Sequence, residues 1–275
     1  MNLEYIYIPI QKEMQSVEQT LAKMIKGNST QELSNQRITD CFFKLAGKRF
    51  RPALTLFSAS IVNTRLLQED REKIIRLAAS FELLHSASLI HDDIIDGDMQ
   101  RRGERTLNSR FGNKVAVLAG DIVFSKAFSG FTSVLPPENV QNLTNLTESM
   151  CNSEIMQIEN RRPSREQYFD IIKGKTAGFM AECCRSGALL GGGTESEISM
   201  LREYGLNFGI AYQLVDDILD GDSDPSLAIT IKDAEIYARR ALDAISTFQE
   251  TACYTGLVHL MQFILDYAGT KKSKI

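Results

Sequence analysis

The sequence contains no tryptophan, only six prolines in 275 residues, and no Cys-x-x-Cys pair. Because proline interrupts helices, its scarcity leaves long segments free to be helical. The odd number of cysteines and their spacing fit neither a disulfide framework nor a zinc site. We therefore expect reduced thiols in a cytoplasmic protein. The five cysteines are Cys41, Cys151, Cys183, Cys184 and Cys253.

Long apolar runs and an excess of basic residues are also missing. No apolar run approaches the ~20 residues that a membrane span needs, and the start, MNLEYIYIPIQKEMQ, lacks the pattern of a secretory signal. The formal net charge of −4 argues against a nucleic-acid partner. With 43% hydrophobic residues the chain can bury a core, which excludes disorder. We expect a folded protein with no transmembrane segment.

Apolar residues recur at helical spacing along most of the chain, and no segment alternates with a period of two for long enough to demand a sheet. Several segments are apolar on most sides, as in the central helices of a large bundle. The sequence therefore predicts an all-α protein, with residues 1–275 in a single domain. Helices are expected at 4–26, 31–45, 49–63, 69–97, 113–133, 138–160, 165–190, 195–220, 232–248 and 252–268.

Two aspartate clusters share the spacing Asp-Asp-x-x-Asp, and each ends an apolar helix. Residues three and four apart lie on one helix face, so we expect each set of carboxylates to point the same way. The helix dipole disfavours negative charge at this end, and Mg²⁺ is the cation that suits such oxygen ligands. A single cluster could equally be a solvated helix end, but two identical copies favour a metal site. The clusters are Asp92, Asp93 and Asp96, and Asp216, Asp217 and Asp220.

Basic residues lie close to these clusters in the sequence. Lys48 and Arg51 are three apart near a predicted helix start, where free N–H groups also favour anions. Arg101 and Arg102 directly follow the first cluster, and arginine can bind phosphate oxygens bidentately. His85 lies seven residues before Asp92 on the same predicted face, although a lone histidine could also be a core residue. This pattern indicates diphosphate binding.

The segment ELLHSASLIHDDIIDGDMQRRGERTLN resembles the first aspartate-rich motif of the trans-isoprenyl diphosphate synthases. GKRFRPAL, GDIVFSKAF, KTAGF and YQLVDDILD resemble other landmarks of that family, in the same order, over roughly residues 40–222. The resemblance implies an all-α bundle around a deep apolar cavity. It also implies a Mg²⁺-dependent polyprenyl diphosphate synthase that works as a homodimer.

The resemblance also implies roles for individual residues. Mg²⁺ and the allylic diphosphate would be held by Asp92, Asp93, Asp96, Asp216 and Asp217, with Asp220 acting through bound water. The allylic diphosphate would also contact Arg101, Lys175 and Gln213, and Thr176 and Gln213 would line the reaction site. Isopentenyl diphosphate would be held by Lys48, Arg51, His85 and Arg102. Glu154 and Gln157 match a polar pair on a neighbouring helix.

Product length is expected to depend on residues just before the first cluster. In short-chain members of the family, bulky aromatic residues four or five positions upstream of the motif close the cavity floor. Here those positions are Ser88 and Ala87, which are both small. The resemblance therefore implies a product longer than farnesyl.

The region after the second cluster departs from the family pattern. A lysine-containing loop and further helices are expected there, but DDILDGDSDPSLAITIKDAEIYARRALDAIS continues almost directly into a helix, and Lys232 lies outside the family motif. This departure leaves open a partner-dependent subunit or a non-catalytic regulator of a hetero-oligomer. A terpene cyclase is the weakest alternative, because that class pairs one Asp-rich motif with an Asn/Ser/Glu motif.

Overall fold

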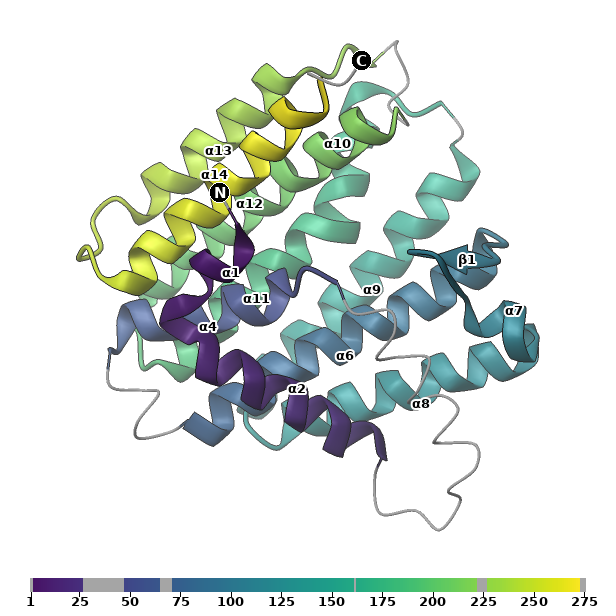
Figure 1. Cartoon of the computed structure of the whole chain (residues 1–275), viewed down its shortest axis with the longest axis horizontal. Helices are drawn as coiled ribbons and strands as arrows, with labels where there is room; N and C mark the ends of the chain where they lie inside the picture. Colours follow the sequence, from purple (N-terminus) through teal and green to yellow (C-terminus); the bar gives the residue numbers. More distant parts are fainter. Residues whose placement is uncertain (1, 27–46, 65–70, 161, 222–226, 273–275) are drawn as a thin grey trace.

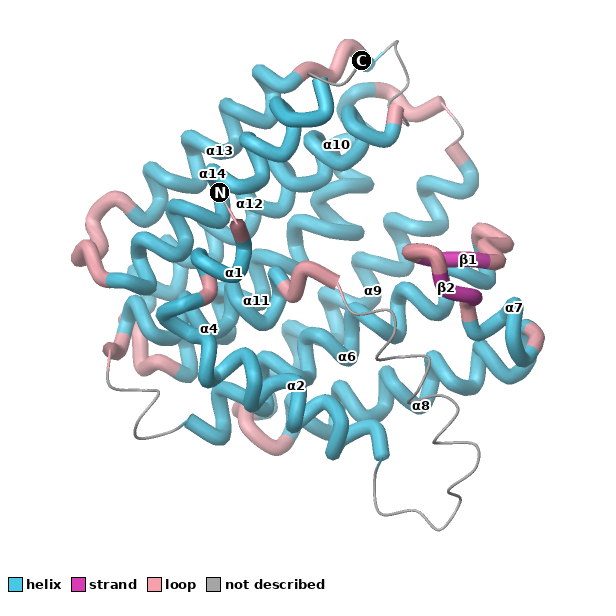
Figure 2. The backbone as a smooth tube through the Cα atoms, in the orientation of Figure 1, coloured by secondary structure: helices cyan, strands magenta, loops and turns pink. Residues whose placement is uncertain are grey.

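The computed structural model describes residues 2–26, 47–64, 71–160, 162–221 and 227–272, with side chains as far as Tyr267. The predicted helix at 31–45, with Cys41, lies outside these residues. In the described part the regular secondary structure is helical except for one short two-stranded ribbon, β1 (Gln100–Arg101) paired antiparallel with β2 (Glu104–Arg105) (Figure 2). The prediction of an all-α protein is confirmed.

Most of the described helices follow the apolar spacing of the sequence. They are α4 (Phe50–Val62), α6 (Arg71–Ile95), α8 (Asn113–Thr132), α9 (Pro137–Glu159), α12 (Glu195–Asp220), α13 (Ile231–Ile245) and α14 (Ala252–Lys272). The short helix α7 (Leu107–Phe111) was not predicted. Helix α6 packs against α8, α4 and α2 (Gln11–Lys26), while α12 packs against α11 (Gly178–Leu190) and α13 (Figure 1). These two long helices carry the two aspartate clusters at their C-terminal ends.

Two predicted helices are divided in the structure. The expected helix at 4–26 consists of α1 (Leu3–Ile6), a 3-10 turn η1 (Ile8–Ile10) and α2 (Gln11–Lys26). Pro9 explains this break, because proline has no N–H to donate and its ring clashes with the preceding turn. The expected helix at 165–190 consists of α10 (Arg165–Ile172), a π-helical turn η2 (Lys173–Ala177) and α11 (Gly178–Leu190).

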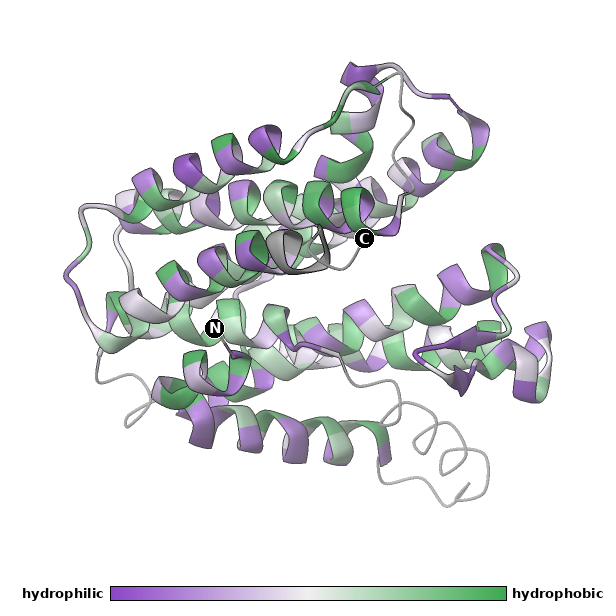
Figure 3. Cartoon of the chain, turned by 45° about the horizontal axis from the view of Figure 1, so that its top comes forward, coloured by the Kyte–Doolittle hydropathy of each residue, from purple (hydrophilic) through white to green (hydrophobic). Residues whose placement is uncertain are grey.

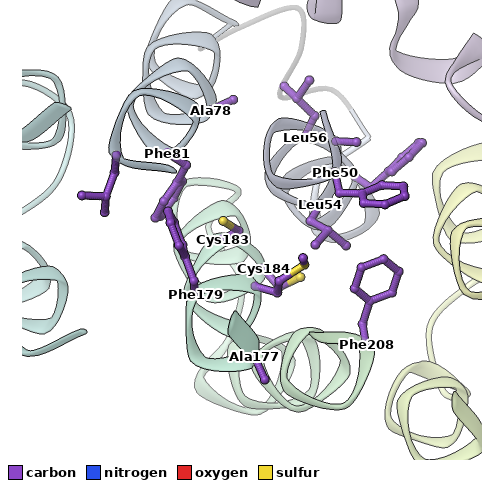
Figure 4. Packing of buried hydrophobic residues seen from close by; sticks show 14 of the residues in the cluster. Phe50, Leu54, Leu56, Ala78, Phe81, Ala177, Phe179, Cys183, Cys184 and Phe208 are labelled. Carbon is purple, nitrogen blue, oxygen red and sulfur yellow. The ribbon is translucent and has the colours of Figure 1, made fainter. Parts of the chain in front are cut away.

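One cluster of buried apolar residues fills the space between α4, α6, α11 and α12. Figure 4 shows Leu54 on α4 close to Cys184 on α11, and Phe81 on α6 close to Phe179 on α11. The rings of Phe81 and Phe179 are 5.9 Å apart between centroids. Hydrophilic residues gather on the outward sides of peripheral helices such as α2, whose buried residues recur at helical spacing (Figure 3). The bundle therefore holds α6 and α12 rigidly from several sides.

Capping residues at both ends of α12 determine where the helix begins and ends, and so where its aspartates lie. Thr194 forms a capping box with Glu197 at the start of the helix. Gly221, with φ of 75°, ends it in the left-handed conformation that glycine adopts without strain. The second aspartate cluster consequently occupies the last turn of α12, beside open space rather than within the packed core.

Candidate active site

A cavity of about 480 Å³ lies between α6, α8, α9 and α12. One end is polar and includes Asp92, Arg101, Lys175 and Asp216. Much of the remaining wall is apolar, from Leu84, Ala87, Leu89, Phe124, Met150, Ile155 and Ile158. A long apolar chain with a charged head group matches this division. We call it the elongation cavity.

A second cavity of about 430 Å³ adjoins the elongation cavity. Lys48, Arg51, His85 and Arg102, the four residues predicted to hold isopentenyl diphosphate, all line it. They come from the segment before α4, from α4, from α6 and from the β1–β2 turn, so the fold gathers residues that are far apart in sequence. We call it the basic cavity. Both cavities are lined by Arg51, His85, Leu89, Arg102, Tyr212 and Asp216.

A third cavity of about 450 Å³ lies between α9, α10 and α12. All three aspartates of the second cluster line it, together with Lys175, Thr176 and Gln213. Asp216 also lines the other two cavities. The end of α12 is therefore the point at which the three spaces meet.

Asp92 and Asp93 of the first aspartate cluster have different surroundings. Asp92 lines the elongation cavity, and its pKa is raised to about 6, chiefly by burial and also by Glu154 and Asp96, while Lys175 opposes the shift. Asp93 is buried and accepts a hydrogen bond of 2.6 Å from Arg101 Nε. Burial raises the pKa of Asp93, and Arg101 opposes this. Asp96 acts electrostatically on both Asp92 and Asp93, so the three carboxylates lie near one another, although among them Asp92 alone lines the elongation cavity.

The second cluster is tied to its neighbours by a chain of hydrogen bonds. Tyr168 donates its hydroxyl to Asp217 Oδ2 over 2.5 Å, and Gln213 Nε2 donates to Asp217 Oδ1 over 2.7 Å. Thr176 Oγ1 in turn donates to Gln213 Oε1 over 2.9 Å. The sequence predicted that Thr176, Gln213 and Asp217 belong to one site. In the structure Thr176 is hydrogen-bonded to Gln213, and Gln213 to Asp217.

Lys175 points toward α9, where it forms an ion pair with Glu154 and donates to Gln157 Oε1 over 3.1 Å. These are the two polar residues that the sequence indicated on a neighbouring helix. Lys175 lines both the elongation cavity and the third cavity. The Lys175 ammonium group is therefore placed to bind an anion at the polar end of the elongation cavity.

Buried basic groups characterise the basic cavity. Arg51 Nε is buried and has no hydrogen-bond partner, and the guanidinium carbon lies 4.8 Å from the Phe179 ring centroid. Burial first, and then the positive charges of Arg51 and Arg102, hold the pKa of His85 well below its usual range. His85 is therefore neutral at pH 7. A buried donor without a partner costs stability, which an anion in this cavity would recover.

Two features near this cavity have no clear signal in the sequence. Arg49, between the predicted Lys48 and Arg51, forms an ion pair of 2.6 Å with the partly exposed Glu18 on α2 and one of 2.5 Å with the buried Glu82 on α6. A Cβ atom on Gly47 would lie 2.6 Å from Arg102 Nη1, so a side chain there would push Arg102 aside. Arg49 anchors the segment and Gly47 makes room for Arg102.

The donor set fits Mg²⁺ bound together with a substrate. Among the residues that the structure describes, no three His, Cys, Asp or Glu side chains are gathered closely enough to hold a metal by themselves. Mg²⁺ usually binds one or two carboxylates together with substrate phosphates. Asp92 and Asp216 line the same cavity, and burial makes the Asp92 carboxylate costly to ionise without a cation. Lys232 is exposed and lines none of the three cavities.

One described helix, α8, is long and apolar enough to cross a membrane by length and composition alone. The expectation that no such segment exists is thus met only in part. Core helices of soluble proteins pass the same test, and α8 packs along α6 here, with 39% of its apolar window buried. Its length and composition are weak evidence for a membrane span.

Comparison with known proteins gives a consistent result. The polyprenyl synthetase family model matches residues 33–233. An octaprenyl diphosphate synthase from Escherichia coli is 31% identical over 227 residues, which are 82% of this chain and 68% of that protein. A short chain isoprenyl diphosphate synthase from Methanocaldococcus jannaschii is 34% identical over 180 residues, 63% of this chain. The aligned region covers 54% of that archaeal protein and 58% of its Methanothermobacter thermautotrophicus counterpart, just over half of each.

The fold has close counterparts among solved structures. A polyprenyl synthase from Caulobacter crescentus, crystallised with calcium and isoprenyl diphosphate, superimposes with a TM-score of 0.86 at 22% identity. The superposition covers 96% of this chain and 97% of that chain. At this level of identity the likeness establishes the fold, which agrees with the family found from the sequence.

Proposed function

Since the chain belongs to the polyprenyl synthetase family, we propose that it condenses isopentenyl diphosphate with an allylic diphosphate to form a polyprenyl diphosphate longer than farnesyl. One observation carries this proposal. A cavity with carboxylates at one end and an apolar wall adjoins a cavity lined by basic residues, and both are lined by Arg51, His85 and Asp216. Two diphosphates of different kinds can be held side by side in such a pair.

The allylic diphosphate would occupy the polar end of the elongation cavity. Asp92 and Asp216 line that end, and with Asp93, Asp96 and Asp217 they would hold Mg²⁺, which would neutralise charge on the leaving diphosphate. Lys175 and Arg101 add positive charge at the same end and favour cleavage of the carbon–oxygen bond. Asp220 lines the neighbouring cavities and would act through bound water.

Isopentenyl diphosphate would occupy the basic cavity. Lys48, Arg51 and Arg102 would bind its phosphate oxygens, and neutral His85 can donate one hydrogen bond without adding charge. Its alkene then faces the shared wall and attacks the allylic carbon. The apolar wall keeps water from the developing cation, and the released diphosphate is the proposed acceptor of the final proton. Thr176 and Gln213 would line the reacting centre.

Product length would follow from the apolar wall. Ala87 and Ser88 both line the elongation cavity, so no large side chain at these two positions blocks a growing chain. Phe124 on α8 is the aromatic residue among the apolar wall residues named above. This arrangement supports a product that extends past Ala87.

The proposal includes a homodimer in the cytoplasm. Helix α8 exposes Val115, Leu118 and Ile122 at a spacing that forms one apolar stripe, which a second copy can cover. The four described cysteines are free thiols, as expected of a reducing compartment.

A product assay on the purified chain tests the function. The protein is incubated with labelled isopentenyl diphosphate, Mg²⁺ and, separately, dimethylallyl, geranyl, farnesyl or geranylgeranyl diphosphate. We expect a ladder of products ending beyond farnesyl, abolished by EDTA and restored by added Mg²⁺. A preparation carrying Asp92→Asn and Asp216→Asn, purified in the same way, controls for contaminating synthases.

The opposite result has a definite meaning. If folded protein incorporates no label with any primer, the active-enzyme proposal fails, and the partner-dependent subunit becomes the better interpretation. A ladder that stops at farnesyl would keep the activity and overturn the proposed product length.

A further inference from the structure

Tyr168 has no assigned role, yet it lies at the start of the hydrogen-bond chain that reaches the reaction site. It is on α10, is 8% exposed, and donates its hydroxyl to Asp217 Oδ2 over 2.5 Å. Asp217 accepts on its other oxygen from Gln213, which accepts from Thr176. The chain Tyr168–Asp217–Gln213–Thr176 thus links α10 to α12 and returns to η2.

The direction of each bond in this chain is determined by its members. An ionised carboxylate only accepts, so Tyr168 must donate to Asp217, and Gln213 must present its NH₂ group to Asp217. The amide oxygen of Gln213 is then left facing Thr176, whose hydroxyl donates. Removing the Tyr168 hydroxyl would leave the Asp217 carboxylate free to rotate. A rotated Asp217 would no longer hold the Gln213 amide in the orientation that accepts from Thr176.

The π-helical turn η2 explains how both ends of this chain reach α12. Tyr168 and Thr176 are eight residues apart, and in an uninterrupted α-helix their side chains would differ by about 80°. The wider turn of η2 takes up one extra residue, so the separation is equivalent to about seven α-helical residues and an offset of about 20°. Tyr168 and Thr176 therefore both face α12. Lys175 is turned toward Glu154 on α9 instead.

We propose that Tyr168 is a positioning residue: through Asp217 it orients the second aspartate cluster and, through Gln213, the Thr176 hydroxyl at the reaction site. This inference rests on the proposed function. It assigns Tyr168 no contact with substrate. The π-helical turn is the element that brings the two ends of the chain onto one face.

Tyr168→Phe tests this role, because it removes only the hydroxyl group. A hydrogen bond to a charged group is worth enough that its loss should weaken Mg²⁺-dependent binding of inorganic diphosphate about tenfold, measured by isothermal titration calorimetry. We also expect kcat to fall by about the same factor or more, with KM for isopentenyl diphosphate unchanged, since Lys48, Arg51 and His85 lie in the other cavity. A merely structural defect would not separate these quantities.

Tyr204→Phe is the matched control. Tyr204 is a fully buried residue of α12 whose hydroxyl donates to Leu257 O over 2.8 Å, away from the three cavities. It should lower the melting temperature but leave diphosphate binding and kcat unchanged. Equal losses in both variants would reduce Tyr168 to a general packing residue and overturn the proposal, as would unchanged binding and kcat in Tyr168→Phe.

A double substitution checks that Tyr168 acts through Asp217. In an Asp217→Asn background, Tyr168→Phe should cause little additional loss of diphosphate binding, because the two groups belong to one chain. Fully additive losses would contradict this route. If the unsubstituted chain binds diphosphate with Mg²⁺ but makes no product, the proposed function fails while the binding comparison still decides the role of Tyr168. If it binds no diphosphate, both proposals fail.

Discussion

At Asp92, burial and nearby acidic groups raise the carboxyl pKa to about 6. In the unfolded chain an aspartate titrates near 3.9. A carboxyl that binds its proton more tightly in the folded state loses stability when it ionises, so this loss develops as the pH rises from about 4 to above 6. At neutral pH Asp92 is ionised, and the full loss of folding stability is present in the metal-free protein. A bound cation would offset this loss.

Asp92→Asn should therefore stabilise the metal-free protein at pH 7.5. We expect the free energy of unfolding in EDTA to rise by about 1–2 kcal/mol, less than the whole pKa shift implies because Asp92 is partly exposed to solvent. Urea unfolding at pH 7.5 and at pH 4 measures this. The gain should shrink toward zero at pH 4, and a gain of equal size at both pH values would show that Asp92 ionisation is not its source.

The sequence predicted residues that belong to repeated or spaced motifs and missed those that do not. Asp92, the second aspartate cluster and the basic set line the cavities described above, whereas Asp93 is bonded to Arg101 and, like Asp96, lines none of the three. Tyr168 stands in the unremarkable sequence EQYFD and is brought to Asp217 only by the packing of α10 on the site. The partners of Arg49 likewise come from two other helices. Such contacts depend on tertiary structure, which spacing alone does not encode.

Among the helices, those with local start and stop signals were predicted closely. Helix α12 occupies the expected range because Thr194 caps its start and Gly221 its end. The break at Pro9 could have been predicted, because proline interrupts a helix. The prediction of one helix over 4–26 followed the apolar spacing instead and was wrong at this point. The π-helical turn has no specific signal, since Gly174 weakens the helix at Lys173–Ala177 but does not by itself predict a π-turn. The β1–β2 ribbon turns through Arg102 and Gly103, both with positive φ, and only the glycine marks it in the sequence.

Helix α6 carries Asp92 and Asp93 of the first aspartate cluster and part of the wall of the elongation cavity, so the proposed function predicts that product length depends on its inner face. Ala87 lies 1% exposed on that face and lines the elongation cavity. Ala87→Phe should place a ring in the path of the growing chain and shorten the product, and Ala87→Leu should shorten it less. Chromatography of the dephosphorylated products measures both. An unchanged product distribution from an active, folded Ala87→Phe protein would mean that the chain grows along another wall.

At the scale of the whole molecule, the apolar stripe on α8 is one surface of the described residues that a single copy of the chain leaves uncovered. Val115, Leu118 and Ile122 are spaced by three and four residues, and Leu118 is 62% exposed. The same helix contributes Phe124 to the elongation cavity. Covering the stripe with a second copy would bury apolar surface and restrain a helix that forms part of the cavity wall.

Leu118→Glu should therefore convert the dimer to a monomer, because a two-fold interface brings the introduced charge in twice and buries it without a partner. Sedimentation velocity at several protein concentrations measures the assembly. Ile236→Glu is the matched control, since Ile236 is 51% exposed on α13, outside the stripe. We expect this variant to remain dimeric. A monomeric unsubstituted chain would contradict the proposed dimer. A Leu118→Glu protein that stays dimeric would rule out the α8 stripe as the interface, and the exposed apolar residues of α9, Ile155 and Ile158, would then be the next surface to substitute.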